Sequence, residues 1–237
     1  GDRQIQPRAV AKMRRAGAAQ TIRIDGEHSW PLYLSNSSRQ IEARAQAELP
    51  SHTLMQRAGL AVAQLALALA PHSQRIWIAC GPGSNGGDGL EAALHLHAWG
   101  KTVQVTWLGS DEQAPPDCRQ SLARIRKAGM VLSDQAPQHW DLAIDALLGL
   151  GCNRPPESTM ADWLRLMHSS RAPILQVDLP SGLSTDNGVW HGHPGPSAAS
   201  RHTLSLLTLK PGLFTADGRD ASGTVWLNSL GIEPTQP

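Results

Sequence analysis

Residues 81–90, GPGSNGGDGL, combine five glycines with an amide and a carboxylate, directly after the apolar run of residues 76–80. Glycine adopts positive φ angles at little cost and lets backbone N–H groups approach an anion closely. The helix expected to follow would direct its positive N-terminal end at the same point. Asn85 and Asp88 add groups that hydrogen-bond and exchange protons. The segment therefore predicts a phosphate-binding turn between a strand and a helix.

Two other apolar runs also end in a carboxylate. Asp145 closes the run from residue 141 and is followed by the glycine-containing loop 149–155, and Asp178 closes the run 174–177 and is followed by residues 179–182. Open parallel sheets bind ligands beyond the carboxyl ends of their strands, so we expect the three segments to converge. Two carboxylates at one sheet edge are typical of a cation site or of acid–base chemistry.

Each of these features also has a structural interpretation. The GxGxxG pattern of Gly81, Gly83 and Gly86 occurs in ordinary strand-to-helix turns. Asp88 is equally suited to capping the following helix. Asp145 could cap a helix or close a turn, and the segment 178–182 could be a simple turn because proline and glycine are turn formers. Two nearby glycines and an Arg-Pro pair favour a binding loop after Asp145, and a functional role is favoured for Asp178 because it directly follows an apolar strand.

The elements that must position these residues alternate along the chain. Apolar spacing predicts a helix from residue 38, a second helix from residues 51–53 to 71, and then strands and helices in turn. The expected strands are 75–80, 102–108, 141–146 and 173–178, with later strands near 203–208 and 223–227; the expected helices between them are 88–99, 117–128 and 157–168. This order predicts an α/β fold with a mostly parallel sheet and helices on both faces.

The composition fits one domain without a general affinity for nucleic acid or membranes. The 237 residues include 21 basic and 20 acidic side chains, for a formal charge of +1. The longest apolar stretch, residues 60–70, is well short of the roughly 20 residues of a membrane span. Three scattered cysteines favour a reducing cytoplasm over a disulfide framework. Residues 1–30 are interpreted as a flexible basic extension, and residues 234–237 as a linker-like tail.

Four motifs resemble one known family when they are taken together and in order. They are GPGSNGGDG at 81–89, DALLGLGCNRP at 145–155, VDLPSGLSTDNG at 177–188 and LKPGL at 209–213. They are similar to the motifs of the NAD(P)H-hydrate epimerase family, the YjeF N-terminal domain, and residues 54–62 resemble that family's second helix. The resemblance covers residues 32–233, so an epimerase domain is expected over 31–233.

The resemblance implies a Rossmann-like three-layer sandwich that interconverts the R and S forms of hydrated NADH and NADPH, a repair reaction. It implies a homodimer, one potassium ion per subunit, and a fused or separate dehydratase that uses ADP or ATP. It assigns potassium to Asn85, Asp145 and Ser181, and catalysis to Asp178 beside the reacting ring. Its substrate-binding residues are Ser84, Asn85, Gly86, Gly87, Asp88, Gly149, Leu150, Gly151, Cys152, Asn153, Arg154, Pro155 and Asp178.

The sequence departs from the family at three of these motif positions. Ser84 stands where a second Asn is usual, and Leu150 and Ser184 stand where Thr and Asp are common. A serine hydroxyl still donates and accepts hydrogen bonds, so the change at Ser84 concerns affinity rather than the reaction.

The chemistry of the implied substrate suits a carboxyl group. The ring nitrogen expels the C6 hydroxyl once an acid protonates it, and water then attacks the flat iminium from either face. Asp178 is expected to give that proton and to take one back from the returning water. Two other interpretations remain: an NAD-dependent dehydrogenase with Asp111 as its ribose-binding acid, and a non-catalytic binding or scaffold module of the same fold.

Overall fold

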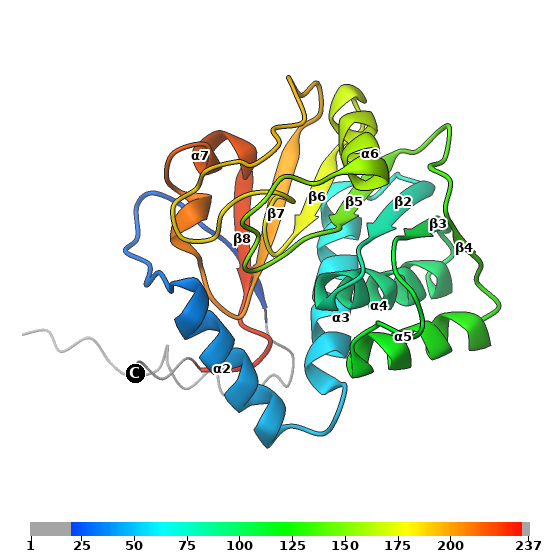
Figure 1. Ribbon diagram of the computed structural model, residues 1–237, viewed down its shortest axis with the longest axis horizontal. Helices are drawn as coiled ribbons and strands as arrows, with labels where there is room; N and C mark the ends of the chain where they lie inside the picture. Colours follow the sequence, from blue (N-terminus) through cyan, green and yellow to red (C-terminus); the bar gives the residue numbers. More distant parts are fainter. Residues whose placement is uncertain (1–19, 234–237) are drawn as a thin grey trace, which may run out of the picture.

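The structure, a computed structural model, describes residues 20–233, and within them one sheet runs through the molecule (Figure 1). Its order is β1-β8-β7-β6-β5-β2-β3-β4. Every neighbouring pair is parallel except β1 with β8. The strands are β1 (Thr21–Arg23), β2 (Arg75–Cys80), β3 (Thr102–Trp107), β4 (Leu132–Ser133), β5 (Leu142–Ala146), β6 (Ile174–Val177), β7 (Arg201–Leu206) and β8 (Thr224–Asn228).

Helices cover both faces of the sheet, as the alternation of strands and helices predicted (Figure 1). On one face lie α3 (Thr53–Leu69), α4 (Ser84–Ala98) and α5 (Pro116–Lys127); on the other lie α6 (Ser158–Ser169), the 3-10 helix η2 (Pro211–Leu213) and the short α7 (Gly218–Ala221). Strand β2 shows why helices are needed on both faces: its side chains are apolar on both sides. Ile76 and Ile78 pack with α3–α5, whereas Trp77 and Ala79 pack with α6. A strand that is apolar on both sides belongs in the middle of such a sandwich.

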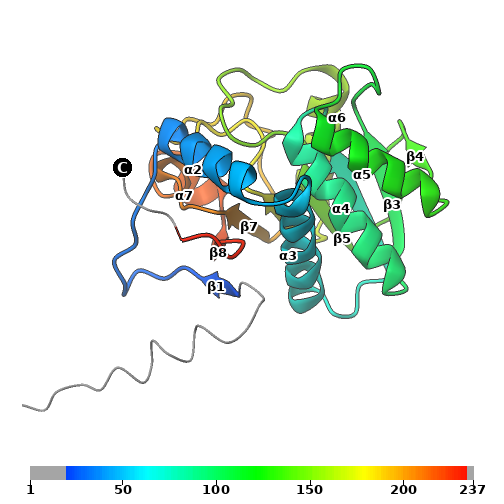
Figure 2. The same cartoon turned by 90° about the horizontal axis from the view of Figure 1, so that it is seen from below.

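The helix α2 (Ser35–Glu48) lies apart from this row, beside the β7–β8 half of the sheet (Figure 2). Its buried residues, Ser38, Ile41 and Ala45, repeat at helical spacing along one side. The chain just before α2 is fixed to the sheet region because the Tyr33 amide donates to the Leu209 carbonyl oxygen at 2.8 Å.

The main elements expected from the sequence are confirmed, with differences at their ends. The first helix begins at Ser35 rather than residue 38, and α4 begins at Ser84 rather than residue 88. The expected flexible extension is wrong for residues 21–23, which form the edge strand β1; the Ile24 amide also donates to the Val225 carbonyl oxygen at 2.9 Å. Residues 1–19 and the expected tail 234–237 lie outside the described residues.

No helix among residues 20–233 combines the length and the apolar character that crossing a bilayer requires.

Candidate active site

The glycine-rich segment forms the first turns of α4 rather than a separate loop. Only residues 81–83 connect β2 to the helix, which begins at Ser84. None of the five glycines from Gly81 to Gly89 has a positive φ, so the expectation that they bend the chain through left-handed conformations is wrong. Asp88 lies in the second turn of α4, which also excludes the capping role considered for it.

Four of these glycines, Gly81, Gly86, Gly87 and Gly89, are required because other atoms occupy the space of a side chain, whereas the space at Gly83 is open. A Cβ on Gly81 would overlap the carbonyl oxygen of Leu147, and a Cβ on Gly86 would overlap the carbonyl oxygen of Gly81. A Cβ on Gly87 would lie 2.5 Å from Met55 Sδ. The N-terminus of α4 can therefore approach the end of β5 and the helix α3 closely. The first N–H groups of this 15-residue helix have no partner within the helix itself and present positive charge there.

Asp145 and Ser181 connect the ends of β5 and β6, as the sequence predicted. Ser181 Oγ donates to Asp145 Oδ1 at 2.6 Å, and the Ser181 amide donates to Oδ2 at 3.2 Å. The Leu147 amide donates to Oδ1 at 3.1 Å. Burial raises the pKa of Asp145, and these hydrogen bonds oppose that rise. The carboxyl group is therefore fixed in orientation at 1% exposure.

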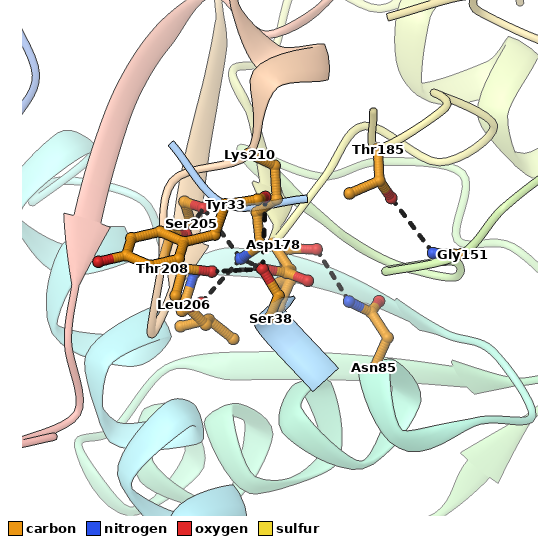
Figure 3. Close-up of polar contacts among 11 residues, drawn as sticks. Tyr33, Ser38, Asn85, Gly151, Asp178, Thr185, Ser205, Leu206, Thr208 and Lys210 are labelled. Carbon is orange, nitrogen blue, oxygen red and sulfur yellow. Dashed lines mark hydrogen bonds and ion pairs between the residues drawn. The ribbon is translucent and has the colours of Figure 1, made fainter. Parts of the chain in front are cut away.

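Asn85 connects α4 to the same edge. Its amide Nδ2 donates to the Val177 carbonyl oxygen at 2.8 Å (Figure 3). Its Oδ1 is buried and has no hydrogen-bond partner among residues 20–233. Gly149 lies directly against it, because a Cβ there would be 2.9 Å from Asn85 Nδ2. A buried acceptor without a donor is costly unless an ion or another ligand completes it.

Asp178, at the end of β6, has an unusual backbone and a strong partner. Its φ of 70° lies in the left-handed region, which a non-glycine residue adopts at a cost of about 1 kcal/mol. Lys210 Nζ donates to Asp178 Oδ1 at 2.5 Å, and the Leu206 amide donates to the same oxygen at 3.2 Å (Figure 3). Such conformations concentrate at functional sites.

Lys210 is the residue of the site that the sequence analysis missed. Its ammonium also donates to Ser205 Oγ at 3.1 Å and to the Leu206 carbonyl oxygen at 2.7 Å. The side chain is only 2% exposed, which is rare for lysine unless it is paired. The signal was present in the sequence, because Lys210 is the single charged residue of the LKPGL motif.

A pocket opens beside these residues, between α2, α3 and the N-terminus of α4. Its charged lining residues are Glu42, Asp88, Asp117, Asp178 and Lys210. Burial raises the pKa of Asp88 well above its usual value, and the charges of Glu42 and Asp178 add to the rise. Burial likewise raises the pKa of Glu42, with a contribution from Asp178, whereas Lys210 and Arg39 oppose it. The pKa values of two carboxyl groups of this pocket are thus raised, that of Asp88 the more strongly.

The predicted substrate residues divide into two groups. Ser84, Asp88, Leu150 and Asp178 line the pocket. Gly86 and Gly87 are buried within α4, and Gly149 packs on Asn85. The later loop residues do not line this pocket; they are Gly151, Cys152, Asn153, Arg154 and Pro155. Within this loop, Cys152 Sγ donates to the Arg154 carbonyl oxygen at 3.3 Å.

Asp111 does not lie where a ribose-binding acid would be needed. Both of its carboxylate oxygens accept hydrogen bonds from Arg126, at 2.6 and 3.0 Å, and both side chains are more than half exposed. Asp111 does not line the pocket. The dehydrogenase interpretation therefore loses the feature that distinguished it.

The fold and the site define a Rossmann-like α/β domain whose candidate site lies at the carboxyl ends of its parallel strands, where this class binds its ligands. The family described as YjeF-related protein N-terminus matches residues 51–212, which include all the strand-end residues discussed above. The chain belongs to that family.

Similar proteins agree with this assignment. The NAD(P)H-hydrate epimerase of Limosilactobacillus fermentum is 36% identical over 183 residues, covering 76% of this chain and 86% of that protein. The bifunctional NAD(P)H-hydrate repair enzyme Nnr of Escherichia coli is 34% identical over 197 residues; the match covers 81% of this chain but only 37% of the Escherichia coli protein. The crystal structure of yeast ynu0, YNL200c, superposes with a TM-score of 0.69 at 21% identity, covering 87% and 96% of the two chains, and so supports the fold.

Proposed function

We propose that this chain is an NAD(P)H-hydrate epimerase, an isomerase that interconverts the R and S hydrates of NADH and NADPH. The proposal is supported by relatives that are named NAD(P)H-hydrate epimerase and that this chain matches over most of their length. The observation that carries it is the placement of Asn85, Asp145, Asp178 and Ser181 at one sheet edge. Ser181 donates to Asp145, and Asn85 donates to the carbonyl oxygen of Val177, the residue before Asp178. A module of this fold with no catalytic role would not require a buried lysine to hold a strained aspartate.

Asp178 is the proposed catalytic residue beside the reacting ring. Lys210 Nζ has three N–H groups, and the three acceptors Asp178 Oδ1, Ser205 Oγ and Leu206 O account for them. Lys210 is thus a positioning residue for Asp178. Because Oδ1 of Asp178 is held in this ion pair, we propose that Asp178 stabilises the positive iminium rather than donating the proton.

The proton for the departing hydroxyl then requires a neutral carboxyl group in the same pocket, and Asp88 fits best. Its pKa is raised well above normal, chiefly by burial. Asp88 protonates the C6 hydroxyl, the ring nitrogen lone pair breaks the C–O bond, and water leaves. When water adds to either face of the iminium, the Asp88 carboxylate takes back its proton. Atoms and charge balance over the cycle.

A potassium ion fits the residues that the resemblance assigned to it. Asn85 Oδ1 is a buried oxygen without a donor, and Asp145 and Ser181, at the ends of neighbouring strands, have further oxygens to offer. Oxygen donors are the ligands that hard cations prefer. The ion would supply positive charge next to the phosphate-binding end of α4. No group of three or more His, Cys, Asp or Glu suited to a transition metal occurs among the described residues.

The homodimer and a dehydratase partner remain proposals as well. The relatives named bifunctional repair enzymes are much longer than this chain, which spans 37% of the Escherichia coli protein. Light scattering on the purified chain measures its oligomeric state directly.

The activity test follows the stereochemistry of the substrate. Purified (R)-NADHX and (R)-NADPHX are incubated with the protein, and the R and S forms are separated chromatographically over time. We expect interconversion well above the spontaneous rate, and its loss in Asp178→Asn. A protein that binds the hydrates without interconverting them would instead be a non-catalytic module.

A further inference from the structure

The helix α2 presents a positively charged side chain to the loop that the resemblance assigns to substrate. A Cβ on Gly151 would overlap Arg39 Nη2, so the guanidinium lies against the backbone of that loop. Gly151 has a φ of +86°, and its amide donates to Thr185 Oγ1 at 3.2 Å, which fixes the loop at this point (Figure 3).

The position of Arg39 is set before any ligand binds, because α2 is anchored at two points. At its first turn, the Ser35 amide and hydroxyl donate to the two carboxylate oxygens of Asp186, at 2.8 and 3.0 Å. One turn on, Ser38 Oγ and Thr208 Oγ1 lie 2.9 Å apart (Figure 3). Arg39 directly follows the second anchor.

Arg39 has no hydrogen bond or ion pair within residues 20–233. This distinguishes it from Lys210, whose three N–H groups are all engaged. The other charged groups of the pocket wall are carboxyls, namely Glu42, Asp88, Asp117 and Asp178. A pocket with this lining repels a dianionic dinucleotide unless nearby positive groups compensate. Arg39 does not line the pocket itself, but it lies against Gly151, next to the lining residue Leu150, and its charge acts on Glu42.

The chemistry of guanidinium selects the ligand group. Its planar fork of N–H donors matches two phosphate oxygens and is weakly hydrated, so arginine is favoured where phosphate is bound. The position of Glu42, a neighbour of Arg39 on α2, indicates which phosphate of the substrate Arg39 would bind. Glu42, one turn along α2, interacts electrostatically with Asp178 and Lys210 at the proposed ring end of the pocket. A phosphate next to this end belongs to the pyrophosphate, which adjoins the nicotinamide ribose, and not to the distant 2′-phosphate of the adenosine.

We propose that Arg39 binds the pyrophosphate of the substrate, opposite the N-terminus of α4, and thereby determines substrate affinity. The inference rests on the proposed epimerase function. It adds a residue from α2, upstream of the matched segment 51–212, to the substrate site.

The kinetic test compares NADHX and NADPHX. Arg39→Ala should raise KM about 10-fold for both substrates and leave kcat nearly unchanged, because a charge-assisted contact made equally in ground and transition state is lost. Arg39→Lys should recover part of the affinity, since it restores charge without the fork. Arg44→Ala removes one exposed charge from the same helix, where it does not lie against Gly151, and should keep the wild-type KM. An unchanged KM in Arg39→Ala would refute the proposal, and an increase confined to NADPHX would assign Arg39 to the 2′-phosphate instead.

A binding measurement separates this inference from the proposed function. ADP-ribose contains the pyrophosphate but neither the nicotinamide ring nor the 2′-phosphate, so calorimetry with it requires no epimerase activity. We expect Arg39→Ala to bind ADP-ribose more weakly than wild type or Arg44→Ala does. This expectation holds even if the protein does not interconvert the hydrates. Equal affinity in the three proteins would overturn the role of Arg39, whatever the catalytic result.

Discussion

Lys210 Nζ lies 2.5 Å from Asp178 Oδ1, so a buried lysine from one sequence motif holds the carboxylate that ends β6 in another. The two residues are separated by 32 positions in the chain. The pair fixes one oxygen of Asp178 and leaves the other for the pocket.

Replacing Asp178 with asparagine should lower kcat by roughly 10²- to 10⁴-fold, because the neutral amide no longer stabilises the iminium. The rate of R/S interconversion measures this. Unfolding of the variant in urea serves as a control for its fold. Wild-type turnover by a folded variant would remove Asp178 from the catalytic site.

Replacing Lys210 with methionine should destabilise the protein by about 3–5 kcal/mol, since Asp178, 14% exposed, would be left as a largely buried charge without its partner. Equilibrium unfolding in urea measures the loss. The double variant Asp178→Asn/Lys210→Met should recover part of it. Lys127→Met, which removes an exposed lysine from the end of α5, should change the stability by about 0.5 kcal/mol or less. A Lys210→Met variant as stable as this control would argue against the buried ion pair.

Replacing Asp88 with asparagine should make the free protein more stable at neutral pH. The raised pKa means that folding opposes ionisation of Asp88, so its contribution to stability is complete below the usual value of 3.8 and is lost as pH rises through the folded-state pKa. The stabilising effect of the substitution should therefore disappear when unfolding is measured below pH 3.8. The same variant should lose epimerase activity, because it lacks the proposed acid. A variant that gains no stability at neutral pH would indicate that Asp88 is ionised in the folded protein.

Potassium should raise the melting temperature relative to an equal concentration of tetramethylammonium, whose size excludes it from a buried site. An ion at 100 times its Kd adds about 2.7 kcal/mol. The potassium-dependent increment should vanish in Asn85→Ala, which removes the buried oxygen without a donor. Because the increment is measured within each variant, a general loss of stability does not affect it. An increment retained in Asn85→Ala would place the ion elsewhere.

The sequence was sufficient for the fold class and for part of the site. Alternating apolar runs and helical patterns specify a doubly covered parallel sheet, and the carboxyl ends of such strands share one edge. For that reason Asp145, Asp178 and Ser181 could be assigned to one edge, and the Ser181–Asp145 hydrogen bonds confirm the proximity of those two residues. Strand β1 escaped notice because three residues are too few to show a period, and it depends on its pairing with β8.

The sequence by itself thus determined which strand ends carry chemistry, since residue type and local period are properties of short segments. Only the tertiary structure decided why the glycines are needed, because the atoms of Leu147 and Met55 that exclude a side chain come from other elements. It also decided that Lys210 pairs with Asp178 and that α2 brings Glu42 to the pocket and Arg39 against Gly151. Burial, charge pairing and close approach depend on which segments, distant in the sequence, pack against one another, and a local sequence pattern does not contain that information.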